Sequence, residues 1–147
     1  MTAAVFDATS EDPYFAHSYN KENVNDTLYN PFDGWLFLNI EDLKNWIVCL
    51  QDNVVISEES FKELLHNQYI DDKPSFQGQT SLTEEGELIR NRVGGFYNYI
   101  TLIQSNISSD DHIILLSNNG WGHIGNIAST IDSIIQEKPY SFPLIKK

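Results

Sequence analysis

The side chains that most often act as bases, nucleophiles or metal ligands are few in this chain, namely four histidines and one cysteine. The histidines are His17, His66, His112 and His123, and none of them shows the HxH or HxxxH spacing that brings two imidazoles to one metal ion. Cys49 stands alone, so no CxxC pair is available. We therefore expect no metal site and no cofactor.

Two further arrangements bear on catalysis. His112 follows Asp110 and Asp111, and a carboxylate beside an imidazole can orient it as a general base. Because adjacent residues of a strand point to opposite faces, we interpret this group as the solvated edge of a strand. Cys49 falls within a predicted helix, away from any group that would activate a thiol, and we interpret it as a small hydrophobic residue. No catalytic residue is predicted.

A glycine-rich loop is the remaining candidate for chemistry. Gly120-x-Gly122-x-x-Gly125 lies between a predicted strand and a predicted helix, where backbone amides and a helix N-terminus can hold a phosphate. Only 22 residues follow Gly125, too few for the second half of a dinucleotide-binding fold. We therefore expect a connector, and a small enzyme or nucleotide binder that uses this loop stays as an alternative.

Two amphipathic helices are predicted before residue 70. Asn39 is placed to cap the first helix, and Ser57 to cap the second, with Glu58 and Glu59 favoured by the dipole of its first turn. Both helices repeat apolar residues at one-face spacing. The apolar faces are Leu43, Trp46, Ile47 and Leu50, and Phe61, Leu64, Leu65 and Tyr69.

The next segment is predicted to form a hairpin and a third helix. Phe76 and the Thr80/Leu82 pair flank a glycine turn at Gln77-Gly78-Gln79. Thr83 is placed to cap a helix, in which Gly94-Gly95 marks either a break or a close approach of another backbone. The 4-3-4-3 spacing that predicts this helix comprises Ile89, Val93, Phe96, Ile100 and Ile103.

These elements, with short strands at 35–38 and 112–116 and a last helix through Ile127 to Ile135, predict a single α+β domain. It has four main helices and a short, mostly antiparallel sheet. We assign residues 1–34 to an irregular acidic and aromatic arm, and residues 35–147 to the domain. One shared core is expected, made of Leu43, Trp46, Ile47, Leu50, Phe61, Leu64, Leu65, Ile89, Val93 and Phe96.

The segment 54–93, with its order FKELLHNQYI, DDKPSFQGQ and TSLTEEGELI, resembles the second half of a winged helix-turn-helix domain. The helix ends at Ile70, the 76–82 hairpin is the wing, and Leu82-Thr83 leads into a helix through Glu85-Gly86. The resemblance implies a winged-helix-like centre. It also implies an alternative function, that of a DNA-binding regulator.

The charge of the chain argues against DNA. There are 21 acidic residues against 9 Lys and Arg, a formal net charge of −12. Between Glu41 and Val93, eleven acidic residues face five basic ones, a net charge of −6. Affinity for a duplex depends on cations that replace the counterions of phosphate. We therefore expect no nucleic-acid binding at physiological salt, and steering towards basic partners instead.

The preferred hypothesis is a non-enzymatic acidic protein-binding module with a basic protein partner, such as an immunity protein or an inhibitor that masks a basic surface of a nucleic-acid enzyme. The predicted protein-binding residues are Asp71, Asp72, Glu84, Glu85 and Glu87. The first ten residues lack the features of a signal peptide, and no apolar run approaches the ~20 residues of a membrane helix. We expect a cytoplasmic location and no membrane contact.

Overall fold

The computed structural model describes residues 5–6, 11, 13–19, 36–65, 69–70, 73–74, 79–82, 86–96, 98–120 and 123–142 of the chain. In these residues the fold is α+β, with three helices and an antiparallel sheet. The elements in chain order are β1 (Val5–Phe6), β2 (Leu36–Phe37), α1 (Ile40–Gln51), α2 (Glu58–Leu65), β3 (Tyr69–Ile70), β4 (Lys73–Pro74), β5 (Gln79–Leu82), β6 (Leu88–Phe96), β7 (Tyr99–Asn106), β8 (Asp111–Ser117) and α3 (Ile124–Ile135).

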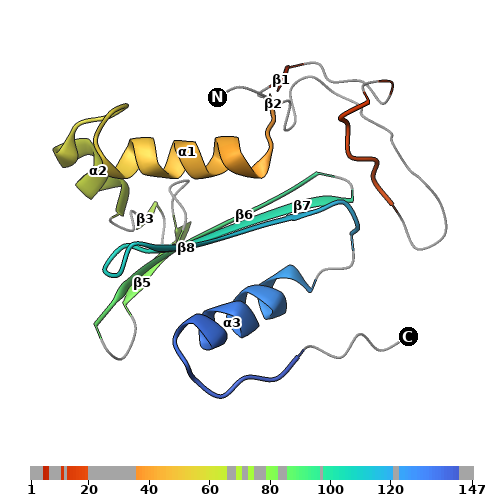
Figure 1. Ribbon diagram of the computed structural model, residues 1–147. Coiled ribbons are helices and arrows are strands. Elements are labelled where there is room, and N and C mark those ends of the chain that lie inside the picture. Colours follow the sequence, from red (N-terminus) through yellow and green to blue (C-terminus); the bar gives the residue numbers. More distant parts are fainter. Residues whose placement is uncertain are drawn as a thin grey trace.

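The centre of the fold is an antiparallel sheet of the three long strands β6, β7 and β8, extended at one edge by the short β5. Pairing of Phe96 with Tyr99 makes β6 and β7 a tight hairpin, and pairing of Asn106 with Asp111 joins β7 to β8. The pairs β1–β2 and β3–β4 form two separate small ladders. Figure 1 shows α1 on one side of the sheet and α3 on the other.

The helix predicted from Thr83 through Ile103 is wrong, because β6 and β7 occupy that part of the chain. Gly86 has φ +84°, a conformation that favours glycine and interrupts a right-handed helix. Gly94-Gly95 would weaken a helix interior further. The 4-3-4-3 spacing arises from apolar residues that the two strands place on both faces of the sheet. With this correction the described residues hold three helices in place of the predicted four.

The predicted hairpin is also altered. Residues 79–82 do form a strand, but β5 pairs with β6, Thr80 opposite Arg90 and Leu82 opposite Leu88. The other predicted arm, at Phe76, lies outside the described residues. A two-stranded ladder occurs earlier, where Tyr69 pairs with Pro74. The helix that the winged-helix resemblance implies after Glu85-Gly86 is replaced by β6.

The remaining three predicted helices are present, and two of their caps are confirmed. The second helix is shorter than predicted, because α2 ends at Leu65 and Tyr69–Ile70 form β3. The side chain of Asn39 accepts a hydrogen bond from the Asp42 amide at 2.8 Å, at the start of α1. Ser57 Oγ accepts one from the Ser60 amide at 3.2 Å, at the start of α2. The strands expected near Trp35–Leu38 and at 112–116 are present as β2 and β8, although β2 pairs with β1 and not with the sheet.

The apolar residues divide between the two faces of the sheet. Under α1 and α2 the buried side chains are Leu43, Ile47 and Phe61; against α3 they are Leu102, Ile113 and Ala128. Four of the ten predicted core residues are buried, namely Leu43, Ile47, Phe61 and Ile89. Ile89 lies next to Arg90 on β6 and therefore on the other face of the sheet, so the prediction of one shared core is wrong. Val93 is 67% exposed, and Trp46 is 40% exposed at the margin of the α1 face. The side chains of Leu64, Leu65 and Phe96 lie outside the described set.

Residues 13–19 lie against one end of the sheet. The Tyr19 amide donates to the Asn118 carbonyl at 2.7 Å, and Tyr99 Oη donates to the Ala16 carbonyl at 2.8 Å. The Phe15 ring centroid is 5.5 Å from that of Phe37. This part of the predicted arm thus contacts both β2 and the sheet, and the boundary at residue 34 stays a prediction.

None of the helices in the described part of the chain has the length and apolar character needed to cross a membrane.

Candidate functional site

The predicted acidic cluster lies almost entirely outside the described residues. This holds for Asp71, Asp72, Glu84 and Glu85. Glu87 is described, and it is half-buried immediately before β6. A helix dipole no longer accounts for an acid at position 87, because β6 begins at the next residue. The grouping of these five carboxylates on one surface stays a prediction.

The clearest acidic surface in the described residues is the corner where α1 meets α2, which Figure 1 shows at the far end of α1. Val54 and Val55 stand in this connection with 71% and 51% of their surfaces exposed. Three exposed carboxylates flank them in sequence, Asp52 on one side and Glu58 and Glu59 on the other. We call these five residues the corner surface.

Local chemistry explains why the chain turns at this corner. Asn53 adopts φ +56°, a left-handed conformation that asparagine tolerates and that ends α1. Ser57 then starts α2, and Lys62 Nζ lies 2.6 Å from Glu58 Oε1 on the exposed side of that helix. The hydrogen bond and the charge of Lys62 lower the pKa of the Glu58 carboxyl. The Glu58 carboxyl is therefore ionised at neutral pH and contributes a negative charge to the corner surface.

A second polar feature crosses the sheet beneath α1. The registers place Arg90 opposite Ser105 and Ser105 opposite His112, so these residues form one row across β6, β7 and β8. Arg92 lies two residues further along β6 and shares the face of Arg90. The sequence interpretation missed both arginines, because an Arg-x-Arg pair falls on one face only when the segment is a strand.

The surroundings of the two arginines lower the pKa of each guanidinium group. Burial lowers the pKa of Arg90, and the neighbouring charge of Arg92 lowers it further. Burial also lowers the pKa of Arg92. In addition, the buried Nε of Arg90 has no hydrogen-bond partner within the described part of the chain. Two like charges, removed in part from water, would be stabilised by an anion placed between them.

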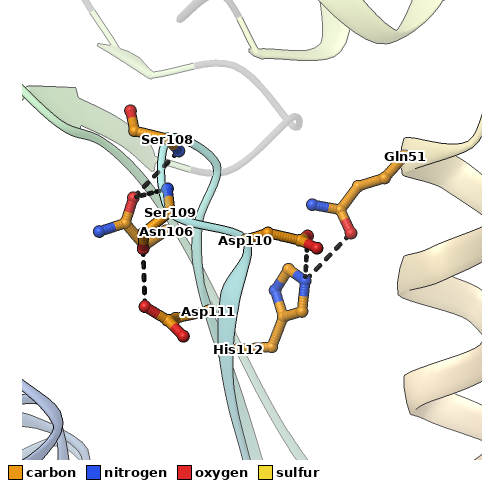
Figure 2. A network of polar contacts seen from close by, with 7 residues as sticks. All are labelled: Gln51, Asn106, Ser108, Ser109, Asp110, Asp111 and His112. Carbon is orange, nitrogen blue, oxygen red and sulfur yellow. Dashed lines mark hydrogen bonds and ion pairs between the residues drawn. The ribbon is translucent and has the colours of Figure 1, made fainter.

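At the other end of the row, His112 belongs to a network of polar contacts (Figure 2). His112 Nε2 lies 3.0 Å from Gln51 Oε1 in the last turn of α1, and 3.3 Å from Asp110 Oδ1. Asp110 has φ +61° and belongs to the turn between β7 and β8, so its carboxylate folds back towards the imidazole. Asp111 instead accepts a hydrogen bond from Ser109 Oγ at 2.7 Å.

This arrangement revises the sequence interpretation of the Asp110–His112 group. The opposite-face argument fails for Asp110, which contacts the imidazole, and His112 is half-buried where a solvated strand edge was expected. Of the described residues, Gln51 and Asp110 hydrogen-bond to His112. The network joins α1 to the sheet.

The same loop is fixed by a side chain on its other side. Asn106 Oδ1 accepts hydrogen bonds from the amides of Ser108 and Ser109, at 3.0 and 3.2 Å. Such a turn around an asparagine is a common way to connect two strands. Figure 2 shows Asn106 and His112 on opposite sides of the strand end, so the loop is held from both sides.

The glycine-rich loop connects β8 to α3 as predicted. A Cβ at Gly120 would lie 3.0 Å from Asn98 Oδ1, so close packing against the β6–β7 hairpin accounts for this glycine. Gly125 already belongs to α3, and Gly122 lies outside the described residues. At the start of α3, His123 makes no side-chain capping hydrogen bond. These observations give the loop a packing role.

No group of three or more His, Cys, Asp and Glu residues is placed to hold a metal ion in the described ranges. Cys49 is half-buried on α1, in line with its interpretation as a small hydrophobic residue. The structure thus leaves two surfaces for further argument, the corner surface and the arginine face beneath α1. Comparisons of the chain with protein-family models, with curated proteins and with solved structures gave no significant match.

Proposed function

We propose that the protein is a non-enzymatic binding module that covers a basic surface of another protein, and that the corner surface takes part in this contact. The observation that supports it best is that two exposed apolar residues, Val54 (71%) and Val55 (51%), are flanked in sequence by exposed carboxylates. These carboxylates belong to Asp52, Glu58 and Glu59. Interfaces commonly combine an apolar centre with a polar rim. Lys62 pairs with Glu58, so the net negative charge of this rim comes from Asp52 and Glu59, and it favours a positively charged partner.

The whole chain supports the same choice. A net charge of −12 on 147 residues produces a field that attracts a basic partner from a distance and speeds encounter at low salt. An inhibitor or immunity protein for a nucleic-acid enzyme would have such a surface, because the enzyme's phosphate-binding site is basic.

The test uses affinity capture from source lysate followed by association kinetics with the captured partner. One variant, Val54→Ser with Val55→Ser, removes the apolar centre, and a second, Asp52→Asn with Glu59→Gln, removes two rim charges. We expect the first to accelerate dissociation about tenfold or more, and the second to slow association and flatten its salt dependence. The matched control, Glu11→Gln with Glu137→Gln, removes two exposed charges outside the corner surface.

Equal binding by all three variants would refute the role of the corner surface. A separate measurement addresses the alternative of a DNA-binding regulator. Fluorescence anisotropy with a labelled duplex should show no binding at physiological salt, because this acidic chain cannot supply the required counterion release. Micromolar affinity with a steep salt dependence would replace the protein-binding proposal with the regulator.

A further inference from the structure

A small cavity lies between α1 and the sheet. Its volume is about 110 Å³. Trp46, Ile47 and Leu50 of α1 supply one apolar wall, and Phe61 of α2 continues it. The opposite wall is the sheet face that carries Arg90 and Arg92, with Ser105 beside them. The cavity therefore combines an apolar side with a cationic side.

The charge of the lining is unusual for this protein. The chain has 21 acidic residues and only 9 Lys and Arg, yet two of those nine line this one cavity. No carboxylate is found among the described residues of the lining. The pair Arg90 and Arg92 extends from adjacent same-face positions of β6, so its two guanidinium groups approach one space.

Arg90 brings a donor that the described residues do not use. Its Nε is buried and has no hydrogen-bond acceptor among them, and leaving a buried donor unpaired is unfavourable. Ser105, directly opposite Arg90 across the ladder, adds a hydroxyl on the same face. Guanidinium groups bind carboxylates through two parallel hydrogen bonds, which fits a planar oxyanion at this position.

We propose that the cavity binds a small organic carboxylate, whose carboxylate group accepts hydrogen bonds from Arg90 and Arg92 and whose apolar body packs against Trp46 and Phe61. The volume sets the size of this ligand. Pockets for drug-sized molecules measure roughly 300 to 1,000 Å³, whereas an apolar cavity of about 150 Å³ accepts benzene. A cavity of about 110 Å³ suits an acid of about four carbons.

The experiment is an NMR titration of the full chain with butanoate, in which the Nε–Hε resonance of Arg90 is followed. Butanamide, its neutral counterpart of the same shape, and inorganic phosphate are titrated in parallel. We expect butanoate to shift the Arg90 resonance saturably and to bind at least about tenfold more tightly than butanamide, because the arginine contacts need a charge. Phosphate lacks the apolar body and should bind more weakly than butanoate.

Three variants locate the site. Arg90→Gln should lower the affinity for butanoate about tenfold or more. Arg90→Lys keeps the charge but not the two parallel hydrogen bonds of a guanidinium group, so it should lower the affinity by less. Lys44→Gln removes an equal charge from the exposed side of α1 and should bind as the wild type does. Arg90→Gln also relieves the like-charge pair, so its melting temperature should equal or exceed that of the wild type in the absence of ligand.

Several outcomes would overturn the inference. Equal butanoate affinity in Arg90→Gln and Lys44→Gln would mean that the acid binds elsewhere. Phosphate binding without butanoate binding would replace the carboxylate by an inorganic anion, and no saturable shift with any probe would remove the site. A melting temperature of Arg90→Gln well below that of the wild type would make Arg90 a structural residue.

Discussion

His112 Nε2 lies 3.0 Å from Gln51 Oε1, and this contact joins β8 to the last turn of α1 (Figure 2). The two residues are 61 positions apart in sequence. His112 is half-buried, and Gln51 lines the cavity between α1 and the sheet, so both side chains are partly shielded from water. The bond thus fixes how closely α1 approaches the sheet at that end.

The first prediction concerns this contact. Gln51→Ala leaves the His112 imidazole with one partner fewer, and we expect the free energy of unfolding to fall by about 0.5 to 1.5 kcal/mol. Asn45→Ala is the matched control, because it removes an amide from the exposed side of the same helix and should change stability by less than about 0.5 kcal/mol. Urea unfolding followed by circular dichroism measures both. Equal losses would show that the hydrogen bond contributes nothing.

Local patterns were enough to predict α1, α2 and α3. The apolar face of a helix is formed by residues three and four positions apart, and its caps act within one turn, so both can be recognised in a short stretch of sequence. Asn39 and Ser57 perform the capping that their positions indicate. Strands are different, because a strand is stabilised by partners far along the chain. The segment from Leu88 to Asn106 has an apolar spacing that also fits a helix, and the pairing of β6 with β7 is a long-range contact that this spacing does not reveal.

The second prediction separates these two interpretations of the same segment. Gly86 has φ +84°, so Gly86→Ala should destabilise the fold by about 1 to 2 kcal/mol although nothing crowds the new Cβ. Gly94 lies in β6 with open space where a new methyl group would lie, so Gly94→Ala should leave the free energy of unfolding unchanged or raise it slightly. Thermal unfolding measures the pair. If both substitutions stabilised the protein by about 1 kcal/mol, a helix would be indicated instead.

The candidate sites were harder to predict than the helices, because each depends on the sheet. Arg90, Ser105 and His112 come together only through the registers of three strands. Trp46 was expected in the core from its helical spacing, yet it is 40% exposed and lines a cavity margin. Periodicity identifies the side of a helix that faces inward, but it does not show where that inner surface ends.

The third prediction tests the division of the apolar residues between two faces. Ile47→Val should cost about 0.5 to 1.5 kcal/mol and Leu102→Ala about 2 to 5 kcal/mol. Because Ile47 and Leu102 lie on opposite faces of the sheet, the double variant should lose the sum to within about 0.5 kcal/mol. Denaturant midpoints for the four proteins of the cycle supply the measurement.

A same-face pair provides the control for this cycle. Leu102 and Ile113 belong to one cluster against α3, so Leu102→Ala with Ile113→Val should depart from additivity by about 0.5 kcal/mol or more. Strong coupling between Ile47 and Leu102, equal to that of the control pair, would restore the single core that the sequence suggested.

The last prediction concerns Asp71 and Asp72 of the β3–β4 hairpin, and it rests on the protein-binding proposal. Asp71 and Asp72 fall between β3 and β4, which pair Ile70 with Lys73. If these carboxylates face the same basic partner as the corner surface, Asp71→Asn with Asp72→Asn should slow association about three- to tenfold at low salt. The dependence of the rate on salt should flatten, and the melting temperature should stay nearly unchanged.

The comparison with Asp52→Asn and Glu59→Gln decides how far the partner surface extends, because both variants remove two negative charges. Equal slowing by the two would indicate one surface that includes the hairpin and the corner. Slowing by the corner variant alone, with the hairpin variant matching the Glu11→Gln and Glu137→Gln control, would remove Asp71 and Asp72 from the interface. Dissociation rates sharpen this distinction, since charges at a rim act mainly on encounter whereas truncated apolar contacts act on dissociation.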